Sequence, residues 1–386
     1  MLSGEKLASP TGLKSLLLSS DEKIVRILRR TLGDLEISVE HCLNPENALR
    51  HLTRERFEAI IVDCAGPGSA DVLRSARSAP CNKRAVAVAI LETGVGLRSA
   101  FDSGAHFILY KPVSPERARS SFRAARALMK KERRRNSRLA LQIPVEMSSR
   151  ESSTQLKVNS ADFGEGGMAV TLPRRIKSQG RWQLSFTLPG TTDLMRLEAE
   201  FAWEGTGRQV GLRFLNQSRE VERQLREWLS RNSPDVEKDD PPVRCQLTDL
   251  TLGGCYLEIA SPFPASTRVN LAMSAGGVNI RIEGLVRVMH PEQGMGVEFI
   301  RRTPEQRAVL ENFLSILTQK RDLLPELLVE PDSLEFDAPE NSKTEGPLHE
   351  EDALLELFRN HSAIPADAFL AELRKQRGLA VAGASV

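Results

Sequence analysis

The chain has 386 residues, of which 40% are hydrophobic and 27% are charged, and its formal net charge is +2. The length excludes a single small domain. The composition is typical of globular proteins, so it excludes a wholly disordered chain. No apolar run approaches the roughly 18 residues that a membrane-spanning helix needs, and no signal-peptide pattern opens the chain, so we expect a cytoplasmic protein with no membrane contact.

Residues 13–130 alternate short apolar runs with stretches whose apolar residues have helical spacing. The predicted strands are 13–18, 57–62, 85–91 and 107–110, and the predicted helices are 21–32, 45–53 and 115–130. Strands that alternate with helices favour a parallel sheet with helices on both faces. The sequence therefore predicts a doubly wound α/β domain over this stretch.

After residue 138 the pattern changes to short strands separated by Gly, Pro and Thr. Six strands and a helix are predicted first, at 139–146, 155–162, 168–172, 182–188, 195–203, 209–214 and 219–229. A polar linker at 232–242 comes next. Five strands and a helix follow it, at 244–250, 254–259, 268–273, 278–288, 295–300 and 304–317. This spacing predicts two small β-barrels of the six-stranded type, each with a C-terminal helix, at 132–231 and 243–320.

The two barrel segments repeat one another in sequence. Asp162 and Asp249 each precede a Gly-Gly pair by four residues, and an apolar strand follows each pair. Both segments also end alike, with VGLRF before the first terminal helix and MGVEF before the second. We therefore interpret the barrels as two copies of one domain.

The C-terminal region divides into an acidic part and a helical part. Residues 321–350 are rich in Pro and acidic residues with few aromatics, which predicts a disordered linker. Two short amphipathic helices are predicted within 351–378, with apolar faces formed by Leu354, Leu357, Phe358, Phe369, Leu370 and Leu373. We expect these helices to dock on an unknown protein partner or on the barrels of the same chain.

Two positions in the α/β domain stand out at the ends of predicted strands. Asp63 ends a buried strand and precedes the letters GPG at 66–68, and Lys111 lies before Pro112 at the end of another strand. These residues resemble those of a response-regulator receiver domain, in which the matching Asp accepts a phosphoryl group and the matching Lys contacts it. The resemblance implies a phosphoacceptor at Asp63 with Lys111 beside it.

One departure from the receiver pattern argues against that activity. Ser19 and Ser20 stand where the family has the acidic pair that holds Mg²⁺, and only Asp21 remains nearby. Serine hydroxyls are poor Mg²⁺ ligands beside carboxylates, and phosphoryl transfer depends on the metal to neutralise charge. We therefore interpret the domain as a pseudo-receiver in which Asp63 pairs with Lys111, with regulated phosphorylation as the alternative.

Arginines lead into the first predicted barrel strand, and a glycine-containing turn follows the second. The arginines are Arg133, Arg134, Arg135 and Arg138, and the turn is Asp162-x-Gly164-x-x-Gly167. Arginine forks bind phosphates and the O6/N7 edge of guanine, whereas an Asp carboxylate accepts hydrogen bonds from the guanine N1 and N2 donors. Together they predict a site for a guanine nucleotide with several phosphates.

This arrangement resembles the PilZ domain, a β-barrel that binds the bacterial second messenger cyclic di-GMP through an RxxxR segment and a [D/N]xSxxG turn. The resemblance covers residues 132–230, and its one departure is Gly164, which stands where the family has Ser. The missing hydroxyl removes a hydrogen bond worth about 0.5–1.5 kcal/mol, which weakens binding without abolishing it. The resemblance implies a ligand site formed by Arg134, Arg135, Arg138, Asp162, Gly164 and Gly167.

The second copy matches only the turn. Asp249, Thr251 and Gly254 keep the spacing, and Thr251 retains the hydroxyl, but only Arg244 stands upstream. The linker before it is acidic at 235–240, which opposes phosphate binding. We interpret this copy as a degenerate second site, kept for packing or partner contact.

Two oppositely charged segments suggest further contacts. Residues 119–138 hold nine Lys or Arg and one Glu, a composition typical of a solvated helix face or a nucleic-acid contact. Phe122 is the one aromatic residue in this stretch, so interleaved aromatics do not support the latter, and nucleic acid is not an expected partner. Residues 321–360 hold twelve acidic and three basic residues, and we hypothesise that this tail occupies the arginine segment until a nucleotide displaces it.

Nothing in the sequence points to catalysis. The chain lacks GxSxG, HExxH and P-loop motifs, and its six His and five Cys lack catalytic or metal-ligand spacing. No enzyme activity, cofactor or metal is therefore expected. We expect a non-enzymatic bacterial signalling protein, a cyclic di-GMP effector that acts through protein contacts; the alternative is a nucleotide-free scaffold with degenerate receiver and PilZ domains.

Overall fold

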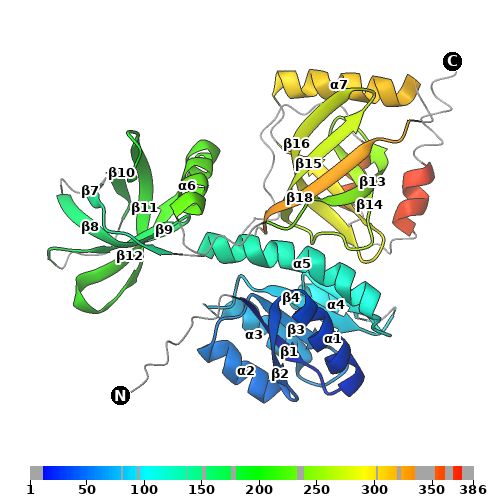
Figure 1. Cartoon of the computed structure of the whole chain (residues 1–386), viewed down its shortest axis with the longest axis horizontal. Coiled ribbons are helices and arrows are strands. Elements are labelled where there is room, and N and C mark those ends of the chain that lie inside the picture. Colours follow the sequence, from blue (N-terminus) through cyan, green and yellow to red (C-terminus); the bar gives the residue numbers. More distant parts are fainter. Residues whose placement is uncertain are drawn as a thin grey trace, which may run out of the picture. The chain divides into compact units, whose positions relative to one another are not determined.

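The computed structural model divides the chain into two compact units (Figure 1). The described residues are 12–79, 81–93, 96–136, 138–149, 154–174, 180–232, 239–300, 303–319, 323–334, 353–360 and 368–375. One unit combines residues 1–132 with 239–386, and the other comprises residues 133–238. The N-terminal domain and the second barrel thus form one unit, and the first barrel forms the other.

A five-stranded parallel sheet forms the centre of the N-terminal domain. Its strands are β1 (Leu13–Leu18), β2 (Ile37–Cys42), β3 (Ala59–Asp63), β4 (Val86–Leu91) and β5 (Phe107–Tyr110), in the order β2-β1-β3-β4-β5. This order is the flavodoxin-like one, so the predicted doubly wound fold is confirmed. The sequence pattern does not reveal β2, because this edge strand buries only its two end residues and has no apolar run.

Helices cover both faces of this sheet. One face carries α1 (Glu22–Asp34) and α5 (Pro115–Asn136), and the other carries α2 (Pro45–Arg54), α3 (Ser69–Ser78) and α4 (Leu97–Asp102). The sequence pattern does not reveal α3 and α4, which are short and begin after Gly68 and Gly96 in left-handed conformations without a side-chain cap. The usual N-cap signal is therefore missing from both.

The first barrel has the predicted six strands, with the first prediction split in two. Its elements are β6 (Leu139–Ala140), β7 (Pro144–Ser149), β8 (Gln155–Gly164), β9 (Gly167–Thr171), β10 (Trp182–Thr187), β11 (Leu194–Glu204), β12 (Gln209–Leu215) and α6 (Arg219–Asn232). Strands β8, β7, β10, β11, β12 and β9 close in that order, because β8 pairs with both β7 and β9. Short β6 adds to β8.

The second barrel is also closed by six strands, but the sixth was not predicted. Its elements are β13 (Val243–Leu250), β14 (Gly254–Glu258), β15 (Thr267–Ala275), β16 (Val278–His290), β17 (Gly294–Phe299), α7 (Pro304–Gln319) and β18 (Glu326–Leu334). The prediction of a disordered linker was therefore wrong for 326–334. Leu327 and Val329 are buried and alternate with exposed Glu326 and half-buried Glu330, a strand period that acidic composition conceals.

One strand position is equivalent in the two barrels, but the strand that occupies it comes first in the sequence of one barrel and last in the sequence of the other. In the first barrel, β7 lies between β8 and β10 and precedes both in sequence. In the second, β18 lies between β13 and β15, antiparallel to both, but follows all the other strands. In the second barrel, the strand that an arginine segment would precede is therefore replaced by β18, which comes from the C-terminal region. This permutation gives a structural reason for the missing RxxxR motif in the second copy.

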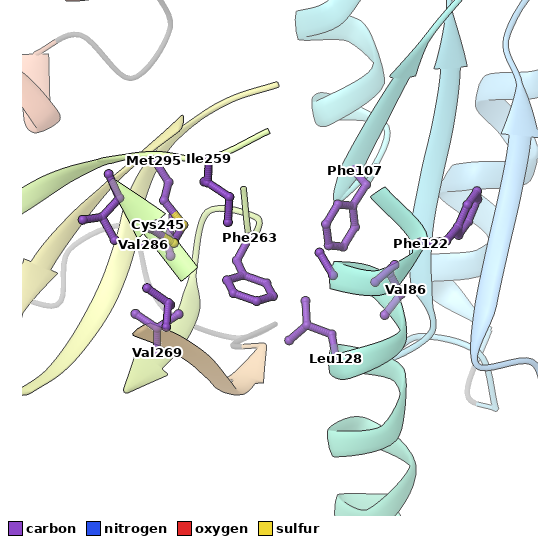
Figure 2. Packing of buried hydrophobic residues seen from close by; sticks show 14 of the residues in the cluster. Val86, Phe107, Phe122, Leu128, Cys245, Ile259, Phe263, Val269, Val286 and Met295 are labelled. Carbon is purple, nitrogen blue, oxygen red and sulfur yellow. The ribbon is translucent and has the colours of Figure 1, made fainter. Parts of the chain in front are cut away.

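The N-terminal domain and the second barrel share one hydrophobic core. Phe107 and Leu128 of the domain belong to the same cluster of buried residues as Phe263 and Val269 of the barrel, and Phe263 points from the barrel toward Leu128 in Figure 2. Helix α5 is buried along most of its length, because the sheet covers one side and the barrel covers another.

Acidic residues of the same unit pair with the basic residues of α5. Lys130 lies 2.9 Å from Asp240, Arg126 lies 3.1 Å from the same carboxylate, and Lys131 lies 2.9 Å from Glu330. These cations pack against protein, which argues against the nucleic-acid interpretation. Acidic residues of the linker and tail thus hold α5; residues 335–352, which the tail hypothesis also needs, lie outside the described part.

Candidate nucleotide site of the first barrel

The predicted turn is the hairpin that connects β8 and β9. Asp162 lies opposite Ala169, and Gly164 lies opposite Gly167, so the DxGxxG letters fall on two paired strands. The Asp162 Oδ1 atom accepts the Ala169 N–H at 3.2 Å across this pair. Hydrogen bonding therefore fixes the carboxylate on the hairpin, close to the turn.

The structure brings one predicted arginine directly to this carboxylate. Arg138 Nη1 donates to Asp162 Oδ1 at 2.8 Å, and the two side chains are 42% and 33% exposed. The register of β6 explains the contact, because Leu139 and Ala140 pair with Phe163 and Asp162 and so carry the preceding Arg138 to the turn. The ion pair is open to solvent, so a ligand can reach both groups.

The other predicted arginines lie on the last turn of α5. Arg133, Arg134 and Arg135 are half-buried there, and this helix end carries the negative pole of the helix dipole. Cations at such an end stabilise the helix, so these residues have a structural role whether or not a ligand binds. They precede Arg138 by a few residues of chain.

Gly167 has a structural role that the motif alone does not disclose. A Cβ atom at this position would lie 2.1 Å from the Leu212 carbonyl oxygen of β12, and at the matching Gly254 it would lie 2.5 Å from the Val297 carbonyl oxygen. Only glycine fits where the strands approach this closely. The glycine shared by the two copies is thus required by the barrel itself.

Replacing Gly167 with alanine is expected to destabilise the first barrel by about 1–3 kcal/mol, because the added methyl group overlaps backbone. All three tryptophans of the chain, Trp182, Trp203 and Trp228, lie in this barrel, so tryptophan fluorescence during urea unfolding reports its stability within the full chain. Gly166→Ala is the matched control, because a Cβ atom there has no neighbour within 4 Å and the backbone has no positive φ. Equal unfolding midpoints for Gly167→Ala and wild type would contradict this interpretation.

Two further features of the site carry no sequence signal. The carboxylate of Glu165, in the turn, accepts from Arg226 of α6 at 2.9 Å, which ties the helix to the hairpin. Arg213 lies opposite Gly167 on β12, and its Nε donates to Glu200 at 2.9 Å. Arg213 is an exposed cation beside the turn, and only the pairing of β9 with β12 reveals its position.

The second copy uses its motif residues to hold its own turn. Thr251 Oγ1 accepts the N–H groups of Gly253 and Gly254, each at 3.1 Å, and Asp249 Oδ1 accepts the Leu250 N–H at 2.8 Å. A Cβ atom at Gly254 would also lie 3.3 Å from Leu355 of α8 (Ala353–Asn360). The hydroxyl retained in this copy thus caps a turn that a C-terminal helix contacts.

The receiver-like site is a closed cluster around Asp63. Lys111 Nζ lies 2.9 Å from Asp63 Oδ1, and Ser19 Oγ donates to Asp63 Oδ2 at 3.0 Å. Burial alone would lower the pKa of Lys111, but its hydrogen bonds and charge interactions with Asp63 and Glu92 together outweigh that effect and raise the pKa. The Lys111–Pro112 peptide bond is cis.

The residues around Asp63 do not fit a magnesium ion. Asp21, the remaining acid, caps α1 by accepting the N–H groups of Lys23 and Ile24 at 2.8 and 3.2 Å. Across the described ranges no group of three or more His, Cys, Asp or Glu side chains could hold a metal ion. The phosphoacceptor role of Asp63 stays a prediction, and the observed pairs are those of the pseudo-receiver interpretation.

Comparison with known proteins matches both barrels to one family. The model of the PilZ domain matches residues 132–231 and 232–315. A comparison with curated protein sequences gives no match. Residues 132–231 and 232–315 are therefore two PilZ domains, and they follow a receiver-like domain of flavodoxin-like strand order.

Solved structures resemble separate parts of the chain. The chemotaxis response regulator CheY4 of Vibrio cholerae is 22% identical, with 30% of this chain and 98% of that chain covered and a TM-score of 0.28. The PilZ domain of CeSA from a cellulose-synthesizing bacterium is 21% identical, with 23% and 91% covered and a TM-score of 0.20. An adenylate cyclase from Rhodopirellula baltica is 22% identical, with 30% and 87% covered and a TM-score of 0.27.

Proposed function

We propose that the chain is a non-enzymatic signalling effector whose first barrel binds cyclic di-GMP. The observation that carries this proposal is the 2.8 Å ion pair between Arg138 and Asp162, which joins the two halves of the PilZ motif in one exposed site. PilZ and receiver domains are in general not catalytic, and no catalytic motif occurs in the sequence.

The chemistry of the pair suits a guanine dinucleotide. Guanine N1–H and N2–H are donors that the Asp162 carboxylate can accept, while a phosphate can take the guanidinium fork of Arg138. The ligand would thus replace the ion pair between Arg138 and Asp162 with two charge-assisted contacts, one from guanine to Asp162 and one from Arg138 to a phosphate. Arg134, Arg135 and Arg213 supply further cationic groups around the phosphates.

Only the first barrel is proposed as the binding site. In the second barrel a C-terminal strand replaces the strand that an arginine segment would precede, and Thr251 is engaged within its own turn. In the first barrel Gly164 lacks the family hydroxyl, which lowers the affinity by the equivalent of one hydrogen bond, about 0.5–1.5 kcal/mol.

Helix α5 provides a route for the signal along the chain. Its buried residues Phe122 and Leu128 belong to the core of the first unit, whereas its last turn carries the arginine segment of the second unit. A ligand that orders Arg134 and Arg138 would therefore act on the covalent connection between the units. The output would be a changed surface offered to a protein partner.

Isothermal titration of the full chain tests the proposal. We expect saturable heat with cyclic di-GMP and none with cyclic di-AMP at the same concentration, because adenine lacks the adjacent N1–H and N2–H donors that Asp162 would accept. Trp203 of the first barrel is 43% exposed and offers a second signal in the same sample. A folded chain without heat or fluorescence change at high ligand concentration would contradict cyclic di-GMP binding.

The alternative function is that of a nucleotide-free scaffold. Three observations favour it: Gly164 lacks the family hydroxyl, a C-terminal helix contacts Gly254 of the second turn, and Ser19 occupies an acidic position beside Asp63. A scaffold would fold normally and bind neither dinucleotide, which is the negative outcome of the titration above.

A further inference from the structure

The outer face of the second barrel carries a hydrophobic cluster separate from the barrel core. Tyr256 of β14 points outward, since its neighbour Leu257 belongs to the inner core. A β-bulge between Val286 and Val288 of β16 separates Val286, in the inner core, from Val288, on the outer face with Tyr256. Two C-terminal helical segments, α8 and residues 368–375, cover this face. The cluster consists of Tyr256, Val288, Leu354, Leu357, Phe358, Phe369 and Leu373, each at most 2% exposed.

One contact shows that the helices fit a defined notch. A Cβ atom at Gly296 of β17 would lie 2.4 Å from the Phe358 ring, so the absence of a side chain there admits the aromatic ring. The matching glycine of the first barrel is Gly211. The space beside it is occupied by the ring of Trp203 from the same barrel, whose Nε1 would lie 2.1 Å from a Cβ atom at Gly211. The first barrel fills this notch from its own strand, whereas the second depends on α8.

A buried histidine with one unsatisfied ring nitrogen lies beneath the helices. His290 of β16 is 4% exposed, and its Nδ1 shares a 2.9 Å hydrogen bond with the Tyr256 hydroxyl. Its Nε2 is buried without a hydrogen-bond partner among the described residues, and the Phe369 ring centre lies 4.6 Å from the His290 ring centre. A buried nitrogen without a partner costs free energy that solvent exposure would recover.

The chain joins this cover to the barrel by a long connection. Strand β18 ends at Leu334 and α8 begins at Ala353, so eighteen residues lie between them. Fully extended, they would span about 60 Å. The helices can therefore leave the barrel while β18 stays in place.

We propose that the outer face of the second barrel is a docking surface for an amphipathic helix, and that its resident occupant, α8 together with residues 368–375 of the same chain, is a releasable cover. The surface consists of Tyr256, Val288, His290 and the notch at Gly296. Release exposes an apolar face on the unit that contains the receiver-like domain. This proposal is independent of nucleotide binding at the first barrel.

A peptide of residues 353–375 supplied in trans tests the docking surface. We expect a fluorescent peptide to bind the full chain carrying Phe358→Ala and Phe369→Ala at least about tenfold more tightly than it binds wild type, whose face is occupied. The matched control is a peptide with the same two substitutions, which should not bind. No gain in binding by the variant chain would overturn the proposal.

Hydrogen exchange on the same variant shows whether the barrel survives without its cover. We expect the amides of α8 to lose protection while those of β14 and β17 keep theirs. Retained protection in α8 would show that these rings do not hold the helix. Loss of protection in β14 and β17 would show that the helices are part of the barrel fold; either result would overturn the proposal.

The position of His290 also predicts release in acid. Burial lowers the pKa of His290 to about 4, whereas an exposed His has a pKa of about 6.5, so protonation below pH 6.5 favours the uncovered state. Besides His290, the titratable or charged residues on β14, β16, β17, α8 and residues 368–375 are Cys255, Tyr256, Glu258, Arg281, Glu283, Arg287, Glu298, Glu356, Arg359, Glu372, Arg374 and Lys375. Burial is the cause of the shift, and none of these groups contributes to it.

We therefore expect the opening equilibrium of α8 to rise about tenfold between pH 7.5 and 5.5, after correction for intrinsic exchange rates. His290→Gln keeps a neutral hydrogen-bonding group and should remove this pH dependence. A pH dependence that persists in His290→Gln would overturn the role of His290.

Discussion

Replacing both Arg134 and Arg138 with alanine is expected to weaken cyclic di-GMP binding by the full chain at least about a hundredfold. Hydrogen bonds to charged groups contribute about 1.5–3 kcal/mol each, and two such losses exceed the roughly 2.7 kcal/mol that a hundredfold change requires. The Arg138 guanidinium lies 2.8 Å from Asp162, so its loss also leaves this carboxylate without its counter-ion. Isothermal titration at fixed salt measures the change.

The control must remove the same charge from the same barrel. Arg223 and Arg231 of α6 both pair with Glu227 and are well exposed, so the Arg223→Ala, Arg231→Ala double variant is suitable. It should bind within about twofold of wild type, because screening limits the effect of distant charges. Equal losses in both double variants would indicate a general charge effect and argue against a site at Asp162.

Replacing Phe263 with alanine is expected to destabilise the receiver-like domain and the second barrel together, by about 3–5 kcal/mol. Phe263 is fully buried and belongs to the core that joins the barrel to Leu128 of α5 (Figure 2). Hydrogen exchange should show lower protection in β3 and β4 of the sheet as well as in β15 and β16 of the barrel. Such a joint loss follows if the two domains unfold as one unit.

The same sample contains an internal reference, because the three tryptophans lie in the first barrel and both tyrosines lie in the other unit. The tryptophan unfolding transition should therefore be unchanged in Phe263→Ala. Leu324→Ala, at a side chain that is 89% exposed, should change stability by less than about 0.5 kcal/mol. Loss of protection confined to the barrel would contradict a shared core.

Regular patterns made much of the fold predictable. The apolar runs around Leu16, Ile60 and Val88 are buried on both sides of a parallel sheet, which is why they are visible as unbroken runs. The repeat around Asp162 and Asp249 was likewise visible, because both hairpins need glycine at the same close strand contact. Strands β2 and β18 were missed, since their half-exposed, polar residues hide the strand period.

Part of the candidate site was also predictable. The RxxxR and DxGxxG letters identified Arg138 and Asp162, which the structure brings into one ion pair. Arg213 and the Glu165–Arg226 pair have no local signature, because the partners are separated in sequence and meet only through strand pairing and helix docking. The basic run of α5 was misleading for the same reason, since Asp240 and Glu330 neutralise Lys130 and Lys131 from distant segments.

The sequence by itself determined which residue types stand at the hairpin turns, at the sheet edge near Asp63 and along the amphipathic helices, because local periodicity and turn chemistry are properties of neighbouring residues. The tertiary structure alone decided that β18 closes the second barrel, that this barrel shares a core with the receiver-like domain, and that α8 covers Gly296. These outcomes depend on which apolar surfaces meet across long stretches of chain. The free energy of such burial is set by shape and packing between segments, and a local pattern does not contain it.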